Sequence, residues 1–298
     1  MMNGIKCRFC IALMMIALLA ATASLAETLS VQTMDTATAA EANPGYSRYI
    51  DVPGVGPWYY YAQNDPVWDE SVYEQRRYDM KREFGSGGCG PTSLAIALSK
   101  QLTAEEMMAI NDHRNPSRDG YFYCPCSVNT YHCNNRHEPI KVETAEDFLY
   151  NLPQVLGAYA TGNNERREMY RADFAGTSIN LFKHVARDYG LEYYGTSDWE
   201  TVYVELQTGA SVITTVTKGI FTGSSHYMVV AHADEEYVYI LDPLMRTEYP
   251  NDKRGVLEIL EPGLLRAKMS DFGRLSLHGY YILKKDKGIT IKVEARPE

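Results

Sequence analysis

The sequence has little of what marks nucleic-acid-binding or polytopic membrane proteins. Its 298 residues include 29 Lys or Arg against 38 Asp or Glu, a formal net charge of −9, and contain no long basic tract. Proteins that bind phosphate backbones usually carry such a tract, so we do not expect a nucleic acid as partner. Hydrophobic residues at 45% and charged residues at 22% are ordinary globular usage, which argues against a disordered, collagenous or polytopic membrane protein.

Several catalytic signatures are also missing from the sequence. There is no G-x-S-x-G elbow, no G-x-x-x-x-G-K loop and no H-E-x-x-H helix. The sequence therefore carries no local motif that would indicate a serine hydrolase, a nucleotide hydrolase or a zinc protease. No internal repeat is visible either, which disfavours a solenoid or a propeller.

The amino terminus has the pattern of a secretory signal peptide. Lys6 and Arg8 precede an uncharged stretch over 9–26, and small residues stand three and one positions before Glu27. We therefore predict that residues 1–26 form a cleaved signal peptide, the competing interpretation being an uncleaved anchor. Cleavage predicts a secreted or cell-envelope protein with no membrane segment in its mature form.

The remaining chain is expected to form one main domain. Residues 27–45 are rich in Ala, Thr and Ser and predict a flexible leader. The folded domain is predicted over 46–290, with an irregular, cysteine-rich insert at 111–140.

Hydrophobic periodicity and capping residues place helices before strands, which predicts an α+β fold with an antiparallel sheet. An extended segment is expected near 52–61. We expect helices over 70–84, 91–99, 103–110, 144–159, 178–189 and 198–208, and strands over 210–217, 226–233, 236–241, 256–260 and 280–284.

Cys89 is the first candidate for chemistry. It follows a glycine-rich turn and directly precedes a predicted helix. The backbone N–H groups and the positive end of the helix dipole favour a thiolate there. The competing interpretation is a small buried residue packed beside glycines.

His226 and Asp242 are candidates for the groups that would act with Cys89. His226 opens an apolar strand and Asp242 ends the next one. If the two strands pair as a hairpin, their open ends lie together, and Asp242 can orient the imidazole of His226. Taken alone, neither a histidine in a strand nor an aspartate at the end of one indicates an active site. His232, six residues beyond His226 and expected on the same strand face, is the rival base.

Gln63 supplies a fourth candidate. A side-chain amide N–H near the backbone N–H of Cys89 would complete an oxyanion hole for acyl transfer. The competing interpretation is an exposed turn residue.

Four segments together resemble one known family. They are Tyr-Ala-Gln-Asn-Asp-Pro-Val-Trp at 61–68, Gly-Gly-Cys-Gly-Pro-Thr-Ser-Leu-Ala at 87–95, His-Tyr-Met-Val-Val at 226–230 and Leu-Asp-Pro at 241–243. In this order they are similar to the C39-like peptidases of the papain-like cysteine peptidase superfamily. The resemblance extends over most of 58–285.

The resemblance implies a papain-like α+β fold, in which a central N-terminal helix carrying the cysteine packs on a C-terminal antiparallel sheet. It matches Cys89 to the nucleophile, His226 to the general base, Asp242 to the orienting acid and Gln63 to the oxyanion glutamine. The insert at 111–140 and the missing ATP-transporter region differ from the leader-cleaving bacteriocin exporters, so their substrates are not implied.

The expected function is an exported cysteine peptidase or amidohydrolase that acts on a peptide or amide substrate and requires no cofactor. One alternative is a peptidoglycan amidase or an acyltransferase that uses the same site. Another is a catalytically silent module that binds peptides or cell-wall polymers.

The insert poses a separate question. It holds Cys124, Cys126 and Cys133 with His132 and His137 nearby. A disulfide from Cys133 to one of the other two cysteines would leave one thiol spare. A structural zinc bound by Cys124, Cys126, Cys133 and His137 would use all three sulfurs. Both interpretations stay open, and so does the third, that the insert forms neither a disulfide nor a metal site.

Overall fold

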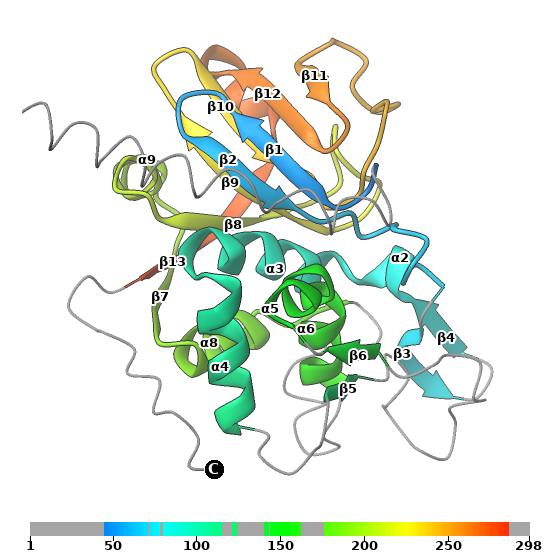
Figure 1. Cartoon of the computed structure of the whole chain (residues 1–298). Coiled ribbons are helices and arrows are strands. Elements are labelled where there is room, and N and C mark those ends of the chain that lie inside the picture. The colour runs from blue at the N-terminus through cyan, green and yellow to red at the C-terminus, as the bar shows by residue number, and fades with distance from the viewer. Residues whose placement is uncertain are drawn as a thin grey trace, which may run out of the picture. The chain divides into compact units, whose positions relative to one another are not determined.

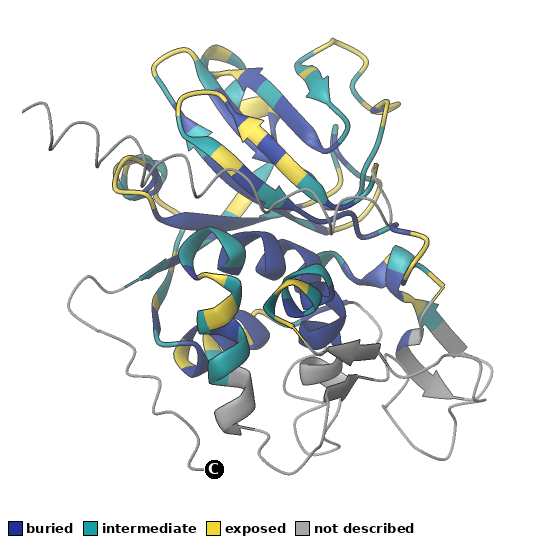
Figure 2. Ribbon diagram, in the orientation of Figure 1, coloured by how far each residue is buried: buried dark blue, intermediate teal, exposed yellow. Residues whose placement is uncertain are grey.

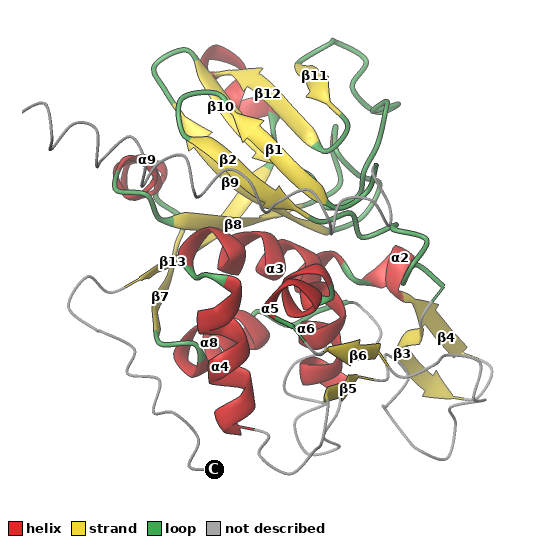
Figure 3. Cartoon of the chain, in the orientation of Figure 1, coloured by secondary structure: helices red, strands yellow, loops and turns green. Residues whose placement is uncertain are grey.

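An antiparallel sheet in the carboxy-terminal half is the framework of the fold (Figure 3). The structure is a computed structural model that describes residues 45–70, 72–77, 80–114, 121–123, 140–142, 144–161 and 176–285. In this part of the chain the main sheet has seven strands in the order β11-β12-β10-β9-β8-β13-β7. These strands are β7 (Leu191–Thr196), β8 (Ser211–Val216), β9 (His226–Ala233), β10 (Tyr237–Leu241), β11 (Leu257–Glu261), β12 (Leu264–Lys268) and β13 (Leu277–Lys285).

Both faces of the central strands are buried. In β9, Val229 packs in the core shared with the amino-terminal helices, whereas Met228 and Val230 pack in a second core on the other side. This explains why the strand sequence is apolar throughout rather than alternating with polar residues. The α+β class predicted from the sequence is confirmed.

The helices gather mainly on one side of the sheet (Figure 1). Helix α3 contacts β8 and β9 on the sheet and also contacts α6 and β2. Its residues from Gly90 to Leu98 are buried, and Figure 2 shows the helix mostly dark blue. The buried helix predicted over 91–99 is therefore confirmed. The described helices are α2 (Phe84–Gly87), α3 (Cys89–Gln101), α4 (Ala104–Arg114), α5 (Ala145–Tyr150), α6 (Leu152–Thr161), α8 (Asn180–Asp188), α9 (Trp199–Gln207) and the 3₁₀ helix η2 (Met269–Arg274).

Three two-stranded hairpins complete the described fold, and one of them corrects a prediction. The charged segment 70–84 is not a helix but forms a hairpin followed by the short α2. Tyr73 explains the difference, because its buried ring packs on Phe84 and its hydroxyl lies 2.7 Å from Thr177 Oγ1. Such tertiary contacts override a local helical pattern. The hairpins pair β1 (Arg48–Val52) with β2 (Gly56–Tyr60), β3 (Val72–Arg77) with β4 (Met80–Glu83), and β5 (Tyr121–Tyr123) with β6 (Ile140–Val142).

The helix predicted over 144–159 is interrupted at Asn151, which separates α5 from α6. Pro153 stands in the first turn of α6, where its missing N–H costs no helical hydrogen bond. In one continuous helix Pro153 could not donate to the carbonyl four residues earlier, and its ring would clash with that carbonyl, which makes such a helix unfavourable. The sequence analysis also missed strands β7 and β12.

Several predictions lie outside the described residues. They are the signal peptide at 1–26, nearly all of the leader at 27–45, and the insert residues Cys124, Cys126, Cys133, His132 and His137. Within the described ranges, none of the helices combines the length and the apolar character needed to cross a bilayer. The boundaries 46–290 stay a prediction.

Candidate active site

Cys89 is the first residue of α3, and its thiol is free of any disulfide. The preceding residue, Gly88, offers no side chain to cap the helix. The first N–H groups of a helix have no partner within the helix, so the N–H of Cys89 is available to an incoming oxygen. Pro91 in the same turn has no N–H. The thiol therefore sits at the positive end of a buried helix.

Glycines flank Cys89 because neighbouring side chains approach the backbone closely. A Cβ at Gly90 would lie 2.4 Å from the side chain of Thr177, and one at Gly88 would lie 2.6 Å from the ring of Phe84. Real Cβ atoms do not come so near other atoms. The glycine-rich turn thus allows the Thr177 segment and α2 to close around the start of α3.

His226 and Asp242 meet as the hairpin prediction required. Strands β9 and β10 pair antiparallel, with Val229 opposite Leu241. Their open ends bring His226 Nε2 to 2.7 Å from Asp242 Oδ1. The imidazole is also close enough to Cys89 for the two groups to shift each other's pKa. Because Nε2 contacts the carboxylate of Asp242, Nδ1 is the ring nitrogen that can interact with the sulfur of Cys89.

Asp242 is held by residues from distant parts of the chain. It is 0% exposed, and its Oδ2 accepts a hydrogen bond of 2.6 Å from Tyr249 Oη. Its Oδ1 accepts a second bond, of 2.9 Å, from the backbone N–H of Leu244. Tyr60 Oη donates to the carbonyl of Asp242 at 2.7 Å, and the N–H of Asp242 donates to the carbonyl of Gly263 at 2.9 Å. These contacts fix the carboxylate against the imidazole.

The three groups shift one another's pKa values. Burial alone would lower the pKa of His226, but the charge and hydrogen bond of Asp242, together with Cys89, raise it to about 10. Burial raises the pKa of Cys89, but the hydrogen bond and charge of His226 outweigh it and bring the pKa below the ordinary value. Burial likewise opposes ionisation of Asp242, yet the charge of His226 leaves its pKa lowered. The site therefore favours a thiolate beside an imidazolium.

Gln63 is anchored next to these residues. Its backbone N–H donates to the carbonyl of Pro243 at 2.5 Å, which ties its loop to the one that carries Asp242. Its side-chain Nε2 donates to the carbonyl of Gly85 at 2.8 Å. This bond fixes the orientation of the amide, because an oxygen in the same place would face another acceptor. Nε2 keeps a second proton for a further acceptor.

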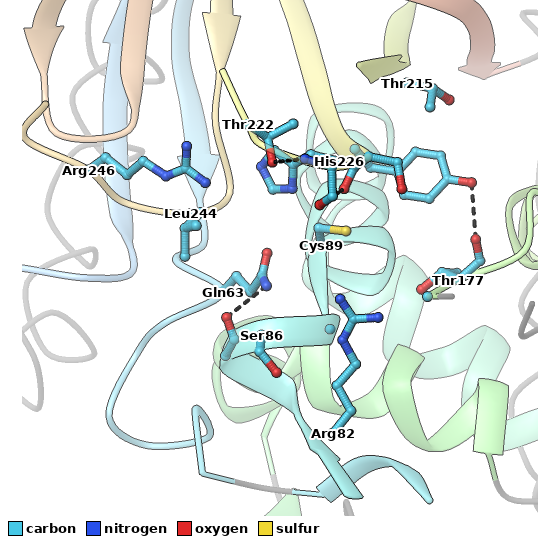
Figure 4. A pocket seen from close by; sticks show the side chains of 16 residues that line it. Gln63, Arg82, Ser86, Cys89, Thr177, Thr215, Thr222, His226, Leu244 and Arg246 are labelled. Atoms are coloured by element: carbon cyan, nitrogen blue, oxygen red, sulfur yellow. Dashed lines mark hydrogen bonds between the residues drawn. The ribbon is translucent and has the colours of Figure 1, made fainter. Parts of the chain in front are cut away.

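Gln63, Cys89 and His226 line one pocket (Figure 4). Asp242, which contacts His226, is fully buried. The structure thus brings together all four residues that the sequence singled out. It adds residues that the sequence analysis missed. Only the two tyrosines among them had any signal in the sequence, namely its high content of 23 tyrosines. The added residues are Tyr60, Tyr249 and Gly263 around Asp242, and Arg82, Thr177 and Arg246 on the walls of the pocket.

His232 does not share this site. The register of β9 and β10 shifts between Val230 and His232, so that Ala231 is an additional residue in the strand. Such a bulge reverses the facing of the residues that follow. The prediction that His232 lies on the same face as His226 was therefore wrong. Its ring stacks on Tyr239 and lies against Gly54.

A free thiol at a helix start, beside an imidazole bonded to a buried carboxylate, defines the arrangement of a cysteine peptidase. The model of the Peptidase_C39 like family matches residues 58–258. The chain belongs to this family of hydrolases, as the sequence motifs indicated.

Two further comparisons add little. The peptidase domain of Streptococcus ComA, described as a bi-functional ABC transporter involved in a quorum sensing pathway, is 18% identical. The match covers 45% of this chain and 86% of that one, with a TM-score of 0.29. At this level the likeness decides neither fold nor substrate. No curated protein matches the sequence.

Proposed function

We propose that the protein is an exported cysteine peptidase or amidohydrolase that cleaves a peptide or amide bond. Cys89 is the nucleophile, His226 the general base and acid, and Asp242 the group that orients His226. The observation that carries the proposal is the 2.7 Å contact of His226 with a carboxylate that is 0% exposed. The apolar N-terminal stretch before Glu27 supports the export.

The reaction proceeds in two stages. In the first, the Cys89 thiolate attacks the carbonyl carbon of the substrate and forms a C–S bond, and the carbonyl electrons move to its oxygen. The tetrahedral intermediate collapses, the C–N bond breaks, and the imidazolium of His226 gives its proton to the leaving amine. In the second, water gives a proton to His226 and attacks the thioester, and the acid and the Cys89 thiolate are released.

Two N–H groups are placed to stabilise the oxyanion. One is the backbone N–H of Cys89 at the start of α3, and the other is the second proton of Gln63 Nε2. Both belong to anchored groups, so they need little reorganisation as negative charge develops. Removing one such donor costs about 100–1000-fold in kcat in other acyl-transfer enzymes.

Cys89→Ala tests the proposal. We expect the variant to fold and to lose both hydrolysis and labelling by a thiol-directed peptide electrophile. Ser99→Ala, at the other end of the same helix, is the matched control and should keep both. Unchanged turnover by Cys89→Ala would refute the assignment.

The range of activity needs a substrate panel that holds peptides, peptidoglycan fragments and an acyl acceptor. Cleavage of peptides by the wild type supports a peptidase, and cleavage of wall fragments alone would make it an amidase. Product formation only with the acyl acceptor would make it a transferase. No turnover of any of these, with Cys89 still unlabelled by the electrophile, would indicate a silent binding module.

A further inference from the structure

The loop that leads into His226 forms one wall of the pocket. Residues 217–225 join β8 to β9, and three of them line the pocket, namely Thr222, Ser224 and Ser225. Ser224 and Ser225 are exposed. The N–H of Ser224 donates to Thr222 Oγ1 at 3.3 Å, and its hydroxyl donates to the carbonyl of Ser225 at 3.4 Å. Both bonds stay within the loop, so the position of this wall segment, residues 222–225, depends on where the loop is attached.

Phe221 attaches the loop to the interior of the protein. Its side chain is 1% exposed and packs in the second of the two cores. Its ring meets the ring of Tyr249 edge to face, with the ring centres 6.0 Å apart. The carbonyl of Thr222 accepts a hydrogen bond of 2.9 Å from the N–H of Gly219, which closes a turn around Phe221. The wall segment therefore begins directly after a buried anchor.

Arg246 holds the backbone of this anchor from another loop. Its Nη1 donates to the carbonyl of Phe221, and its guanidinium carbon lies 5.5 Å from the centre of the Tyr249 ring. Tyr249 in turn donates to Oδ2 of Asp242 at 2.6 Å. Figure 4 shows the guanidinium extending toward Thr222. One side chain therefore joins the wall of the pocket to the segment that holds the buried carboxylate.

Arginine suits this contact better than lysine does. A planar guanidinium stacks on an aromatic ring while it donates in its own plane, which an ammonium group cannot do. A hydrogen bond from a charged donor is also about twice as strong as one between neutral groups. Burial opposes ionisation of Asp242, and the charge of Arg246, after that of His226, helps to lower the pKa of this carboxyl. The guanidinium is thus engaged by Phe221, Tyr249 and the charge of Asp242, which suits a framework role.

We propose that Arg246 is a positioning residue that fixes the wall segment in the place where a peptide substrate must lie against it. The inference rests on the proposed hydrolysis at Cys89 and adds a residue that acts through the carbonyl of Phe221. A misplacement of about 1 Å in a group that positions the substrate can lower the rate about 100-fold. A small reagent needs only the ionised sulfur, so its reaction does not depend on the wall.

The first test measures whether Arg246 holds the loop. Hydrogen exchange of the full chain is followed by mass spectrometry in the peptides that span 217–225. In Arg246→Met, which lacks the charge and the donors, exchange there should become at least about fivefold faster, because the loop opens more often. Peptides from α3 should exchange as in the wild type. Loop exchange that is equal in Arg246→Met and the wild type would overturn the proposal.

Two further variants complete this test. Arg254→Met makes the same replacement at an exposed position outside the pocket and should leave exchange in both segments unchanged. Arg246→Lys keeps the charge but loses the planar group. If Arg246→Met does not fold, Arg246→Lys takes its place, and the loop should again exchange faster than in the wild type.

The second test separates substrate positioning from the reactivity of the sulfur. The rates at which Cys89 reacts with iodoacetamide and with a thiol-directed peptide electrophile are measured at pH 7. In Arg246→Met the second-order rate constant for the peptide reagent should fall at least about tenfold, or ~1.4 kcal/mol, through weaker binding before the covalent step. The rate with iodoacetamide should stay within about threefold of the wild type, because Asp242 and His226 remain charged.

Each other outcome of the second test contradicts a different statement. Equal falls with both reagents would mean that Arg246 acts on the reactivity of the sulfur, which would overturn the positioning role. An unchanged rate with the peptide reagent would overturn it as well. A wild type that reacts with iodoacetamide but not with the peptide reagent would count against the peptidase itself and against the inference that depends on it. Arg254→Met should match the wild type with both reagents.

Discussion

Replacing Asp242 with Asn separates the charge of this buried residue from its shape. The side chain is 0% exposed and contacts His226 Nε2 at 2.7 Å, so the substitution removes a negative charge from a site that water does not reach. Asn can keep an oxygen toward the imidazole. The variant therefore tests whether the carboxylate charge, rather than the presence of a hydrogen-bonding group, maintains the thiolate.

The magnitude follows from the raised pKa of His226, about 10 against an ordinary 6.5. The charge of Asp242 is its largest raising cause, and an opposite charge at this range shifts a pKa by about 1–3 units. Asp242→Asn should lower the pKa of His226 by that amount. Each unit lost lowers the ratio of the ion pair to the neutral Cys89–His226 pair tenfold, or by about 1.4 kcal/mol.

The assay is the rate of Cys89 alkylation by iodoacetamide as a function of pH. The wild type should react at a nearly constant rate through neutral pH, because its thiol ionises below the ordinary range. In Asp242→Asn we expect the rate at pH 7 to fall at least about tenfold and to recover only as an ordinary thiol ionises, near pH 8.5.

Tyr249→Phe is the matched control, because it removes one donor to Asp242 and keeps the charge. Its rate at neutral pH should stay within about threefold of the wild type, since the charge supplies most of the effect. Circular dichroism should show all three proteins folded. A rate profile of Asp242→Asn that coincides with that of the wild type would refute the electrostatic reasoning.

Two other predictions concern stability. Asp242 has a lowered pKa, so its contribution to the free energy of unfolding is present above about pH 3.8 and is lost as the pH falls below that value. His226 has a raised pKa, so its contribution to the free energy of unfolding is full below pH 6.5 and is lost as the pH rises through about 10. The difference in thermal midpoint between the wild type and Asp242→Asn should therefore be larger at pH 6 than at pH 10, by at least about 2–4 °C; an equal difference at both would contradict the linkage. Gly90→Ala should destabilise by about 1–3 kcal/mol, although Ala favours helices, because its Cβ would meet Thr177 at 2.4 Å. Gly223→Ala, with nothing within 4 Å, is its control in urea unfolding, and an unchanged midpoint for Gly90→Ala would show that Thr177 can move away.

The local patterns were sufficient to place the reacting groups on their elements. A glycine turn before an apolar helix placed Cys89 at the start of α3, and two apolar runs joined by a short polar turn predicted the hairpin that brings His226 to Asp242. Both conclusions depend on dihedral preferences and on periodicity, which act over a few residues. The same kind of reasoning failed for 70–84, where the buried ring of Tyr73 decides the conformation.

What the sequence by itself determined is the chemistry of the site: a glutamine, a cysteine, a histidine and an aspartate, in the order of one peptidase family. Only the tertiary structure decided how they are held and what surrounds them. Tyr60 bonds to Asp242 across 182 positions of the chain, and Arg246 stands in a pocket with Arg82. No local pattern encodes such contacts, because they exist only once the sheet and the helices have packed together.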